Sequence, residues 1–372
     1  MCPASLLGYR HGMRLGDRAS SVRLRWPPWV WHAIWYDLAF SGIVSVLSTA
    51  HSLDLPGRQT WWIIFAFMAL CTIWLLTTCV MLEVPVTGSR VLLVLAQMVL
   101  LLIAAISADV HITDVSDIFG GLLAVAILTV GLLDWTSPKP LFTRRDRVLL
   151  LTGALLFVVG IPIQSAWWRL PWGLGVVILG GLGMHVAHRL TDRRALRHRF
   201  GEITVIVLGS AVLNGSYRAA DAALTWRASI GILIGASLVT VLWWIYFQIP
   251  PRVETSGWIL AHVPFLLGGV GLGVGMTYLV IDAEQRVAGG LSMALLWPVA
   301  LALAGLAMLK GRHFPLQALT AGGLALVLAV AGVVLQTAVE THALAVGSAV
   351  LALVVAAGVV MAIEAESSSS RR

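Results

Sequence analysis

The chain has 372 residues, of which 59% are hydrophobic and only 12% are charged. Soluble domains carry about 25% charged residues, so this composition excludes a soluble globular protein. The formal net charge of +7 and the pI of about 9.9 would indicate nucleic-acid binding in a soluble chain. Because the basic residues fall in short loops between apolar segments, we attribute them to membrane orientation and expect no nucleic-acid partner.

Twelve apolar segments follow, each long enough to cross a hydrocarbon core of about 30 Å as a helix. Their continuous apolar character is typical of helices and not of barrel strands. The expected fold is therefore an all-α polytopic transmembrane bundle over residues 29–363, between a basic tail (1–28) and a polar, disordered tail (364–372). The predicted spans are 29–51, 61–82, 91–108, 118–135, 148–166, 168–186, 201–217, 228–249, 257–281, 288–309, 314–336 and 343–363.

The loops between these spans alternate in charge. Of the 25 Lys and Arg residues, 20 fall on the side of the N-terminus, and the other side holds only five. The positive-inside rule makes the rich side cytoplasmic, so both termini are expected in the cytoplasm. A miscounted span would scramble this alternation, and the split therefore also favours the number twelve. The five residues on the opposite side are Arg58, Arg169, Arg218, Arg227 and Arg286.

Asp37 is the clearest functional candidate, because ionisable groups inside spans are costly and commonly functional. It lies a third to half way into the first span and shares a narrow helical face with Ser41, Ser45, Ser48 and Ser52. We interpret this polar face as part of a substrate or ion path, in which Asp37 binds a cation or carries a proton. The alternative is a buried structural acid hydrogen-bonded to a neighbouring helix.

The seventh span carries a second polar set, Glu202, Ser210 and Asn214, which we also place on the path. Glu202 lies close to the cytoplasmic interface. Its alternative role is to pair there with Arg197 or Arg199.

His262 lies beside a proline that should kink the ninth span, and a histidine can change charge near neutral pH. We include it in the path, with a neutral core histidine as the alternative, and add Gln97 of the third span. His185 and His188 are spaced i, i+3, but no further ligand pattern follows, so we expect no metal site. No phosphate-binding loop, nucleophile elbow or H-E-x-x-H motif is present, and we expect neither enzymatic activity nor a cofactor.

Four segments together resemble one family. They are an aromatic-Asp-Leu-x-Phe pattern at 36–40, Arg-Phe-Gly followed by Leu-Gly at 199–209, Trp-Trp-x-Tyr-Phe at 243–247 and His-x-Pro-x-x-x-Gly at 262–268. In order and spacing the chain resembles the bacterial low temperature requirement protein A family from about residue 29 to 281. The resemblance implies a multi-pass protein of the bacterial cytoplasmic (inner) membrane, with no defined substrate.

Two positions depart from the family pattern. Ser210 stands where the family has a glutamate in Leu-Gly-Glu-Ser, and His198 replaces the acid that usually precedes Arg-Phe-Gly. If the family glutamate carries an ion or a proton, this chain lacks that group.

Spacing also suggests an internal repeat. Asp37 lies twelve residues after Arg25, and Ser210 lies eleven residues after Arg199, with both spans entering from the cytoplasm after a basic run. This indicates two parallel six-helix halves, 29–186 and 201–363, of the kind that places transporter sites between halves.

The favoured function is a transporter or permease for a small polar or cationic solute, with Asp37 as the cation or proton site. One alternative is a membrane-embedded transferase whose interfacial active site is built from Glu202, His185, His188 and His198. The other is a non-catalytic membrane component of a stress response. A cavity at the headgroup level would favour the transferase, and a cavity at the midplane around Asp37 would favour transport.

Overall fold

The computed structural model describes residues 36–37, 40, 42, 58–84, 87–110, 116–162, 169–221, 225–248, 256–281, 295–310, 315–336 and 343–370. In this part of the chain, the regular secondary structure is entirely helical. The helices, in chain order, are α2 (Arg58–Glu83), α3 (Gly88–Val110), α4 (Ser116–Trp135), α5 (Arg144–Gly160), α6 (Arg169–His188), α7 (Arg193–Asp221), α8 (Trp226–Phe247), α9 (Ser256–Ile281), α10 (Trp297–Lys310), α11 (Pro315–Gln336) and α12 (Ala343–Ser370).

Nine of the described helices are long and apolar enough to cross a membrane. Their outer faces carry large exposed side chains such as Leu92, Val177 and Leu319, each about 70% exposed. Soluble monomers rarely present such continuous apolar faces to water, so these faces suit contact with lipid. The predicted all-α membrane bundle is thereby confirmed. The count of twelve spans stays a prediction, because most of the first span lies outside the described residues.

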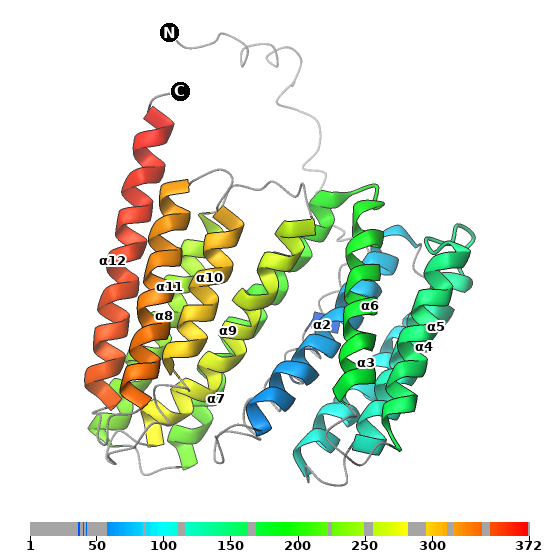
Figure 1. Cartoon of the computed structure of the whole chain (residues 1–372), viewed down its shortest axis with the longest axis horizontal. Coiled ribbons are helices and arrows are strands. Elements are labelled where there is room, and N and C mark those ends of the chain that lie inside the picture. The colour runs from blue at the N-terminus through cyan, green and yellow to red at the C-terminus, as the bar shows by residue number, and fades with distance from the viewer. Residues whose placement is uncertain are drawn as a thin grey trace, which may run out of the picture.

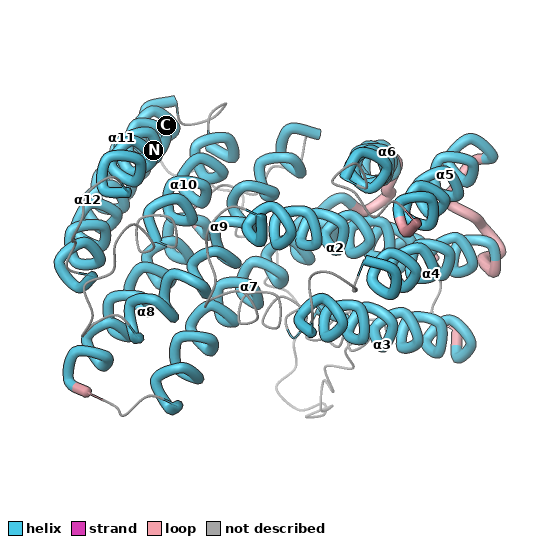
Figure 2. The backbone as a smooth tube through the Cα atoms, turned by 60° about the horizontal axis from the view of Figure 1, so that its bottom comes forward, coloured by secondary structure: helices cyan, strands magenta, loops and turns pink. Residues whose placement is uncertain are grey.

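The described helices form two groups that lie side by side (Figures 1 and 2). In the first group, α3 packs on α4, α4 on α5 and α5 on α6, and α6 returns to α2. In the second, α9 packs on α10, α10 on α11 and α11 on α12, and α12 returns to α8. The groups meet where α2 and α6 contact α7 and α9. The functional candidates must be judged against this junction.

The helices α5 and α7 begin four and eight residues earlier than predicted, because capping residues lie upstream of their apolar runs. The Asp192 carboxylate accepts hydrogen bonds from the backbone N–H groups of Arg194 and Ala195, so α7 begins at Arg193 and not near 201. Thr143 and Asp146 form a capping box that starts α5. At the other end of the chain, α12 continues to Ser370 through residues predicted to be disordered, since alanine and glutamate favour helix.

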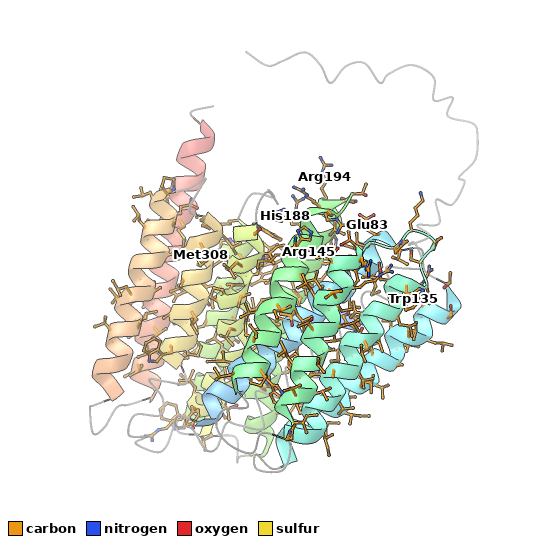
Figure 3. The ribbon with its side chains drawn as sticks, turned by 45° about the vertical axis from the view of Figure 1, so that its right-hand side comes forward. Glu83, Trp135, Arg145, His188, Arg194 and Met308 are labelled. Atoms are coloured by element: carbon orange, nitrogen blue, oxygen red, sulfur yellow. The ribbon has the colours of Figure 1, made fainter. Side chains whose placement is uncertain are left out.

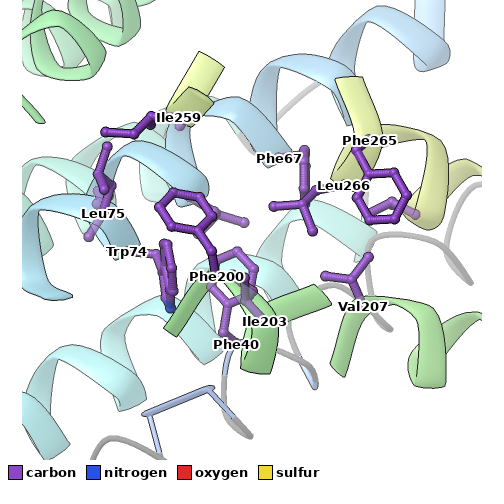
Figure 4. Close-up of a cluster of buried hydrophobic side chains, with 14 of the residues drawn as sticks. Phe40, Phe67, Trp74, Leu75, Phe200, Ile203, Val207, Ile259, Phe265 and Leu266 are labelled. Carbon is purple, nitrogen blue, oxygen red and sulfur yellow. The ribbon is translucent and has the colours of Figure 1, made fainter. Parts of the chain in front are cut away.

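Aromatic side chains fill the junction between the groups. Trp74 of α2 lies 6.4 Å from Phe40 and 5.2 Å from Phe200 of α7, measured between ring centroids. Phe200 in turn contacts Trp258 of α9 at 5.0 Å. We call Phe40, Trp74, Phe200 and Trp258 the aromatic wall. Figure 4 shows Trp74 and Phe200 beside Leu75 and Ile259 in this buried cluster.

One end of the bundle carries a polar network that ties the first group together. Glu83, Arg145, His188 and Arg194 all lie at this end (Figure 3). Asp146 receives a 2.7 Å contact from Arg189, the residue that follows α6. Burial opposes ionisation of Asp146, but hydrogen bonds from Thr143 and the charge of Arg189 outweigh it, and the pKa of the Asp146 carboxyl falls below its ordinary value.

Candidate functional site

Asp37 is paired with Arg199, a buried arginine of α7. Arg199 Nη2 donates to Asp37 Oδ1 at 2.8 Å, and Nη1 lies 2.8 Å from Oδ2. The two side chains are 1% and 4% exposed, respectively. Trp74 Nε1 also donates to Oδ1, at 2.9 Å. A two-point contact between a guanidinium and a carboxylate fixes geometry as well as charge, so this pair holds Asp37 against α7.

Arg199 also binds a second carboxylate. Its Nη1 donates to Glu202 Oε2 at 2.7 Å, one helical turn further along α7. The pairing of Glu202 with Arg199, held open as one reading of the sequence, is therefore observed. His198 Nδ1 lies 3.2 Å from Glu202 Oε1, and the Glu202 side chain is one quarter exposed. A single guanidinium thus joins one sealed carboxylate, Asp37, to one accessible carboxylate, Glu202.

Both ring nitrogens of His262 in α9 have hydrogen-bond partners. Its Nδ1 lies 2.8 Å from the Trp258 carbonyl oxygen, and its Nε2 lies 3.0 Å from the Tyr246 hydroxyl of α8. A carbonyl oxygen can only accept, so Nδ1 carries the proton of the neutral ring and the tyrosine hydroxyl donates to Nε2. The Phe200 ring lies 4.5 Å from the imidazole centroid. This arrangement matches the neutral core histidine that the sequence left open.

A pocket of about 440 Å³ opens between α7, α8 and α9. Its polar lining comes mainly from Arg197, His198, Glu202, Tyr246 and His262. The volume lies within the range typical of small-molecule sites. We call it the polar pocket. The structure therefore brings Glu202 and His262 together at one accessible site.

Asp37 does not line the polar pocket, but it lies directly behind it. The carboxylate is separated from the pocket by Arg199, which contacts Glu202 on the pocket side. Ser41 and Ser45, the predicted companions of Asp37, lie outside the described residues.

The remaining candidates sit away from the polar pocket. Gln97 is buried; it lies 3.2 Å from the Thr77 hydroxyl and donates to the Ala126 carbonyl at 3.0 Å, which ties α3 to α2 and α4. Ser210 donates to the Val207 carbonyl of its own helix at 2.8 Å. It lies about 12 Å along α7 from Glu202, at 1.5 Å per residue. Asn214 is buried one turn further.

The two histidines at the end of α6 serve other contacts. His188 Nε2 lies 2.6 Å from the Ser256 hydroxyl, which joins the ends of α6 and α9. His185 lies 3.9 Å from Asp146. Within the described ranges, three or more His, Cys, Asp or Glu side chains do not gather in a way that could hold a metal ion.

Arg199 and Tyr246 are the site residues that sequence reasoning missed. Arg199 was assigned to the membrane interface, because the start of α7 was placed eight residues too late. The free-energy cost of placing the Asp37 carboxylate inside a span already indicated a buried cationic partner, since acids inside spans usually pair with one. Tyr246 lies in the Trp-Trp-x-Tyr-Phe segment but carried no role of its own.

Comparison with known proteins agrees with the motifs. Neither the curated proteins nor the solved structures compared with this chain gave a match. The family model described as bacterial low temperature requirement A protein matches residues 31–363, which include Asp37, Arg199 and the polar pocket. The chain is therefore a multi-pass membrane protein that belongs to the bacterial low temperature requirement A family.

Proposed function

We propose that the protein is a permease for a small polar or cationic solute, and not an enzyme. The observation that carries the proposal is the position of Arg199, whose Nη1 contacts both Glu202 in the polar pocket and the sealed Asp37, which also accepts a hydrogen bond from Trp74 of α2. We further propose that it resides in the bacterial cytoplasmic membrane with both termini in the cytoplasm, as the positive-inside count indicates.

The shared guanidinium provides a way to couple binding to movement. A cation or proton that binds Glu202 weakens the hold of that carboxylate on Arg199. The charge balance around Asp37 then changes, although Asp37 itself is sealed behind the aromatic wall. A ligand shifts a conformational equilibrium only through differential affinity for the two states. We propose that the differential contact is the Arg199–Asp37 pair, which would break if α7 moved away from Asp37 and from Trp74 of α2.

The helix contacts support two repeated halves. Shifting each helix of the first group by six gives its counterpart in the second: α2 with α6 corresponds to α8 with α12, and α3 with α4 corresponds to α9 with α10. The contacts of α4 with α5 and of α5 with α6 correspond in the same way to those of α10 with α11 and α11 with α12. Transporters built from parallel repeats carry their sites at the junction of the halves.

The polar groups around the site suit a polar solute, and a cation would have to compete with Arg199 and His198 for Glu202. Glu202 offers one partly exposed carboxylate, and Tyr246 and His262 add hydrogen-bonding groups. Ser210, which stands where the family pattern has a glutamate, carries no charge, and its hydroxyl donates to the Val207 carbonyl of its own helix. The carboxylates proposed for coupling are therefore Asp37 and Glu202.

The direct test is solute flux into proteoliposomes that contain the purified protein. A panel of monovalent cations, polyamines and small amines is offered with and without a proton gradient. We expect flux of at least one of them in the wild type and loss of flux in Asp37→Asn, since the neutral amide cannot hold Arg199. Asp134→Asn is the matched control, because Asp134 is also buried but contacts the 141–142 backbone and Arg147.

Both variants are checked for insertion and monodispersity before the flux is compared. Full flux in Asp37→Asn would remove this carboxylate from the mechanism. Absence of flux of every solute by the wild type would remove the permease proposal and leave a non-catalytic membrane component.

One observation favours a second candidate, a membrane-embedded transferase. The polar pocket carries His198 and Glu202 at 3.2 Å from each other, near the end of α7 that begins at Arg193. An accessible carboxylate beside a histidine is a plausible acid–base pair at the headgroup level. Two variants distinguish the two candidate functions. A transferase should lose activity in Glu202→Gln and keep it in Asp37→Asn, whereas a permease should lose flux in both.

A further inference from the structure

A second pocket lies at the junction of the two helix groups. It has a volume of about 260 Å³ and lies between α2, α6, α7 and α9. Its walls include Met68 and Trp74 of α2, Met184 of α6, Phe200 of α7 and Leu266 of α9. We call it the lateral pocket. It lies on the other flank of α9 from the polar pocket, and His262 lines both.

The lateral pocket offers few polar atoms to a water molecule, and the donors of its polar side chains are mostly engaged. The Thr72 hydroxyl donates to the Ala69 carbonyl at 2.7 Å, and the Trp74 indole N–H donates to Asp37. Both ring nitrogens of His262 are engaged by Trp258 and Tyr246. A buried water needs two to four polar partners, so this space suits a hydrocarbon and not water or a polar solute.

The surroundings of the pocket identify the source of that hydrocarbon. Val177 of α6 is 70% exposed and Leu260 of α9 is 48% exposed, and both line the pocket. They belong to the apolar stretches 170–188 and 256–280, which are long enough to cross the membrane. Val177 lies near the middle of its stretch, so this side of the pocket lies at hydrocarbon depth, where acyl chains are the available molecules. At the aqueous end, His188 and Ser256 join the same two helices.

Two features of the wall leave room for a flexible chain. Gly180 and Gly181 line the pocket from α6, and a Cβ atom at Gly181 would meet nothing within 4 Å. Met68 and Met184 supply adaptable thioether side chains, which suit an irregular apolar ligand. We propose that the lateral pocket is a binding site for the acyl chain of a membrane lipid, inserted between the two helix groups against Trp74 and Phe200. This inference does not require the protein to be a permease.

Photo-crosslinking tests this site. The protein is reconstituted with a phospholipid that carries a diazirine in the middle of one acyl chain, irradiated, digested and mapped by mass spectrometry. We expect adducts on Met68 and Trp74, and the Trp74 adduct requires a chain inside the pocket because this side chain is only 1% exposed. Adducts confined to exposed positions such as Val177 and Leu260 would overturn the proposal, because those residues contact bulk lipid in any case.

A pocket-filling variant makes the test specific. Gly180→Leu projects into the space, since a Cβ there would meet only the Thr72 methyl group, at 3.4 Å. Gly173→Leu is the matched control on the same helix, where a Cβ meets nothing within 4 Å. We expect the Met68 and Trp74 adducts to be lost in Gly180→Leu and kept in Gly173→Leu. Met184→Trp fills the same space from another turn of α6 and should also abolish them; adducts that persist in a correctly inserted filling variant would contradict the site.

Discussion

Removing the Arg199 guanidinium should destabilise the protein more than removing any partly exposed arginine. Arg199→Met leaves the Asp37 carboxylate buried without its counter-charge, at 1% exposure. Breaking a buried pair by deleting one partner costs about 3–5 kcal/mol. A Coulomb estimate agrees, because two unit charges about 4 Å apart interact by about 4 kcal/mol at an effective dielectric constant of about 20.

The double variant separates the charge effect from simple loss of packing. In Asp37→Leu combined with Arg199→Met, no unpaired charge remains in the sealed part of the junction, so most of the lost stability should return. Glu202 tolerates the loss of Arg199, because its side chain is one quarter exposed and has His198 at 3.2 Å. The two substitutions should therefore be strongly non-additive, which is the signature of direct contact.

The assay is the midpoint of thermal unfolding in lipid nanodiscs, followed for the four members of this double-mutant cycle. Arg147→Met serves as the control, since Arg147 is 38% exposed and its contact with Asp134 is 3.4 Å long. Asp134 is buried but keeps its hydrogen bonds from the backbone N–H groups of Leu141 and Phe142, so the loss in Arg147→Met should be smaller than in Arg199→Met. If Arg199→Met melts no lower than Arg147→Met, or if the double variant shows the sum of the two single losses, the buried pair does not hold the helix groups together.

Three further predictions concern stability. Asp146→Asn should cost about 1–2 kcal/mol at pH 7, because it removes a helix cap and an ion pair. The folded-state pKa of Asp146 is lowered, so its contribution to stability is complete above the unfolded pKa of about 3.9 and is lost as the pH falls through the folded pKa. The melting curves of wild type and variant should therefore converge in acid. Tyr246→Phe leaves a buried imidazole acceptor unpaired and should cost about 1–3 kcal/mol by denaturant titration, whereas the same change at the 73% exposed Tyr217 should have little effect. Gly268→Ala places a Cβ 2.5 Å from a backbone oxygen of α10 and should cost about 1–3 kcal/mol, while Gly323→Ala meets nothing and should be neutral or stabilising in the same melting assay.

Much of the fold could be predicted from the sequence, because lipid imposes a simple rule on composition. Any long apolar run must become a helix in the hydrocarbon core, so the spans could be located without knowledge of their partners. The ends of the helices were harder to predict from the sequence. The starts of α5 and α7 depend on the side chains of Thr143 and Asp192, which lie outside the apolar runs and cap them from the loops.

The site was predictable only in part, because the partner of each side chain depends on how the helices pack. The cost of a buried charge pointed to Asp37, but its partner is 162 residues away and its identity depends on how two helix groups meet. Helical periodicity places Glu202 and Ser210 on α7 and says nothing of which neighbour each one faces. His262 could be a relay or a core residue from sequence, and only the positions of Tyr246 and the Trp258 carbonyl show that both ring nitrogens are engaged.

The central claim, that the two helix groups move against each other during transport, is tested most directly by a reversible crosslink across the mouth of the lateral pocket. Cysteines replace Val177 and Leu260 in a variant without the native cysteines, and a bis-methanethiosulfonate reagent joins α6 to α9 in proteoliposomes through two disulfides, releasing methanesulfinate. The account predicts that solute flux stops when the crosslink forms and returns when a reductant cleaves it. Flux that continues unchanged through a fully crosslinked protein would contradict it.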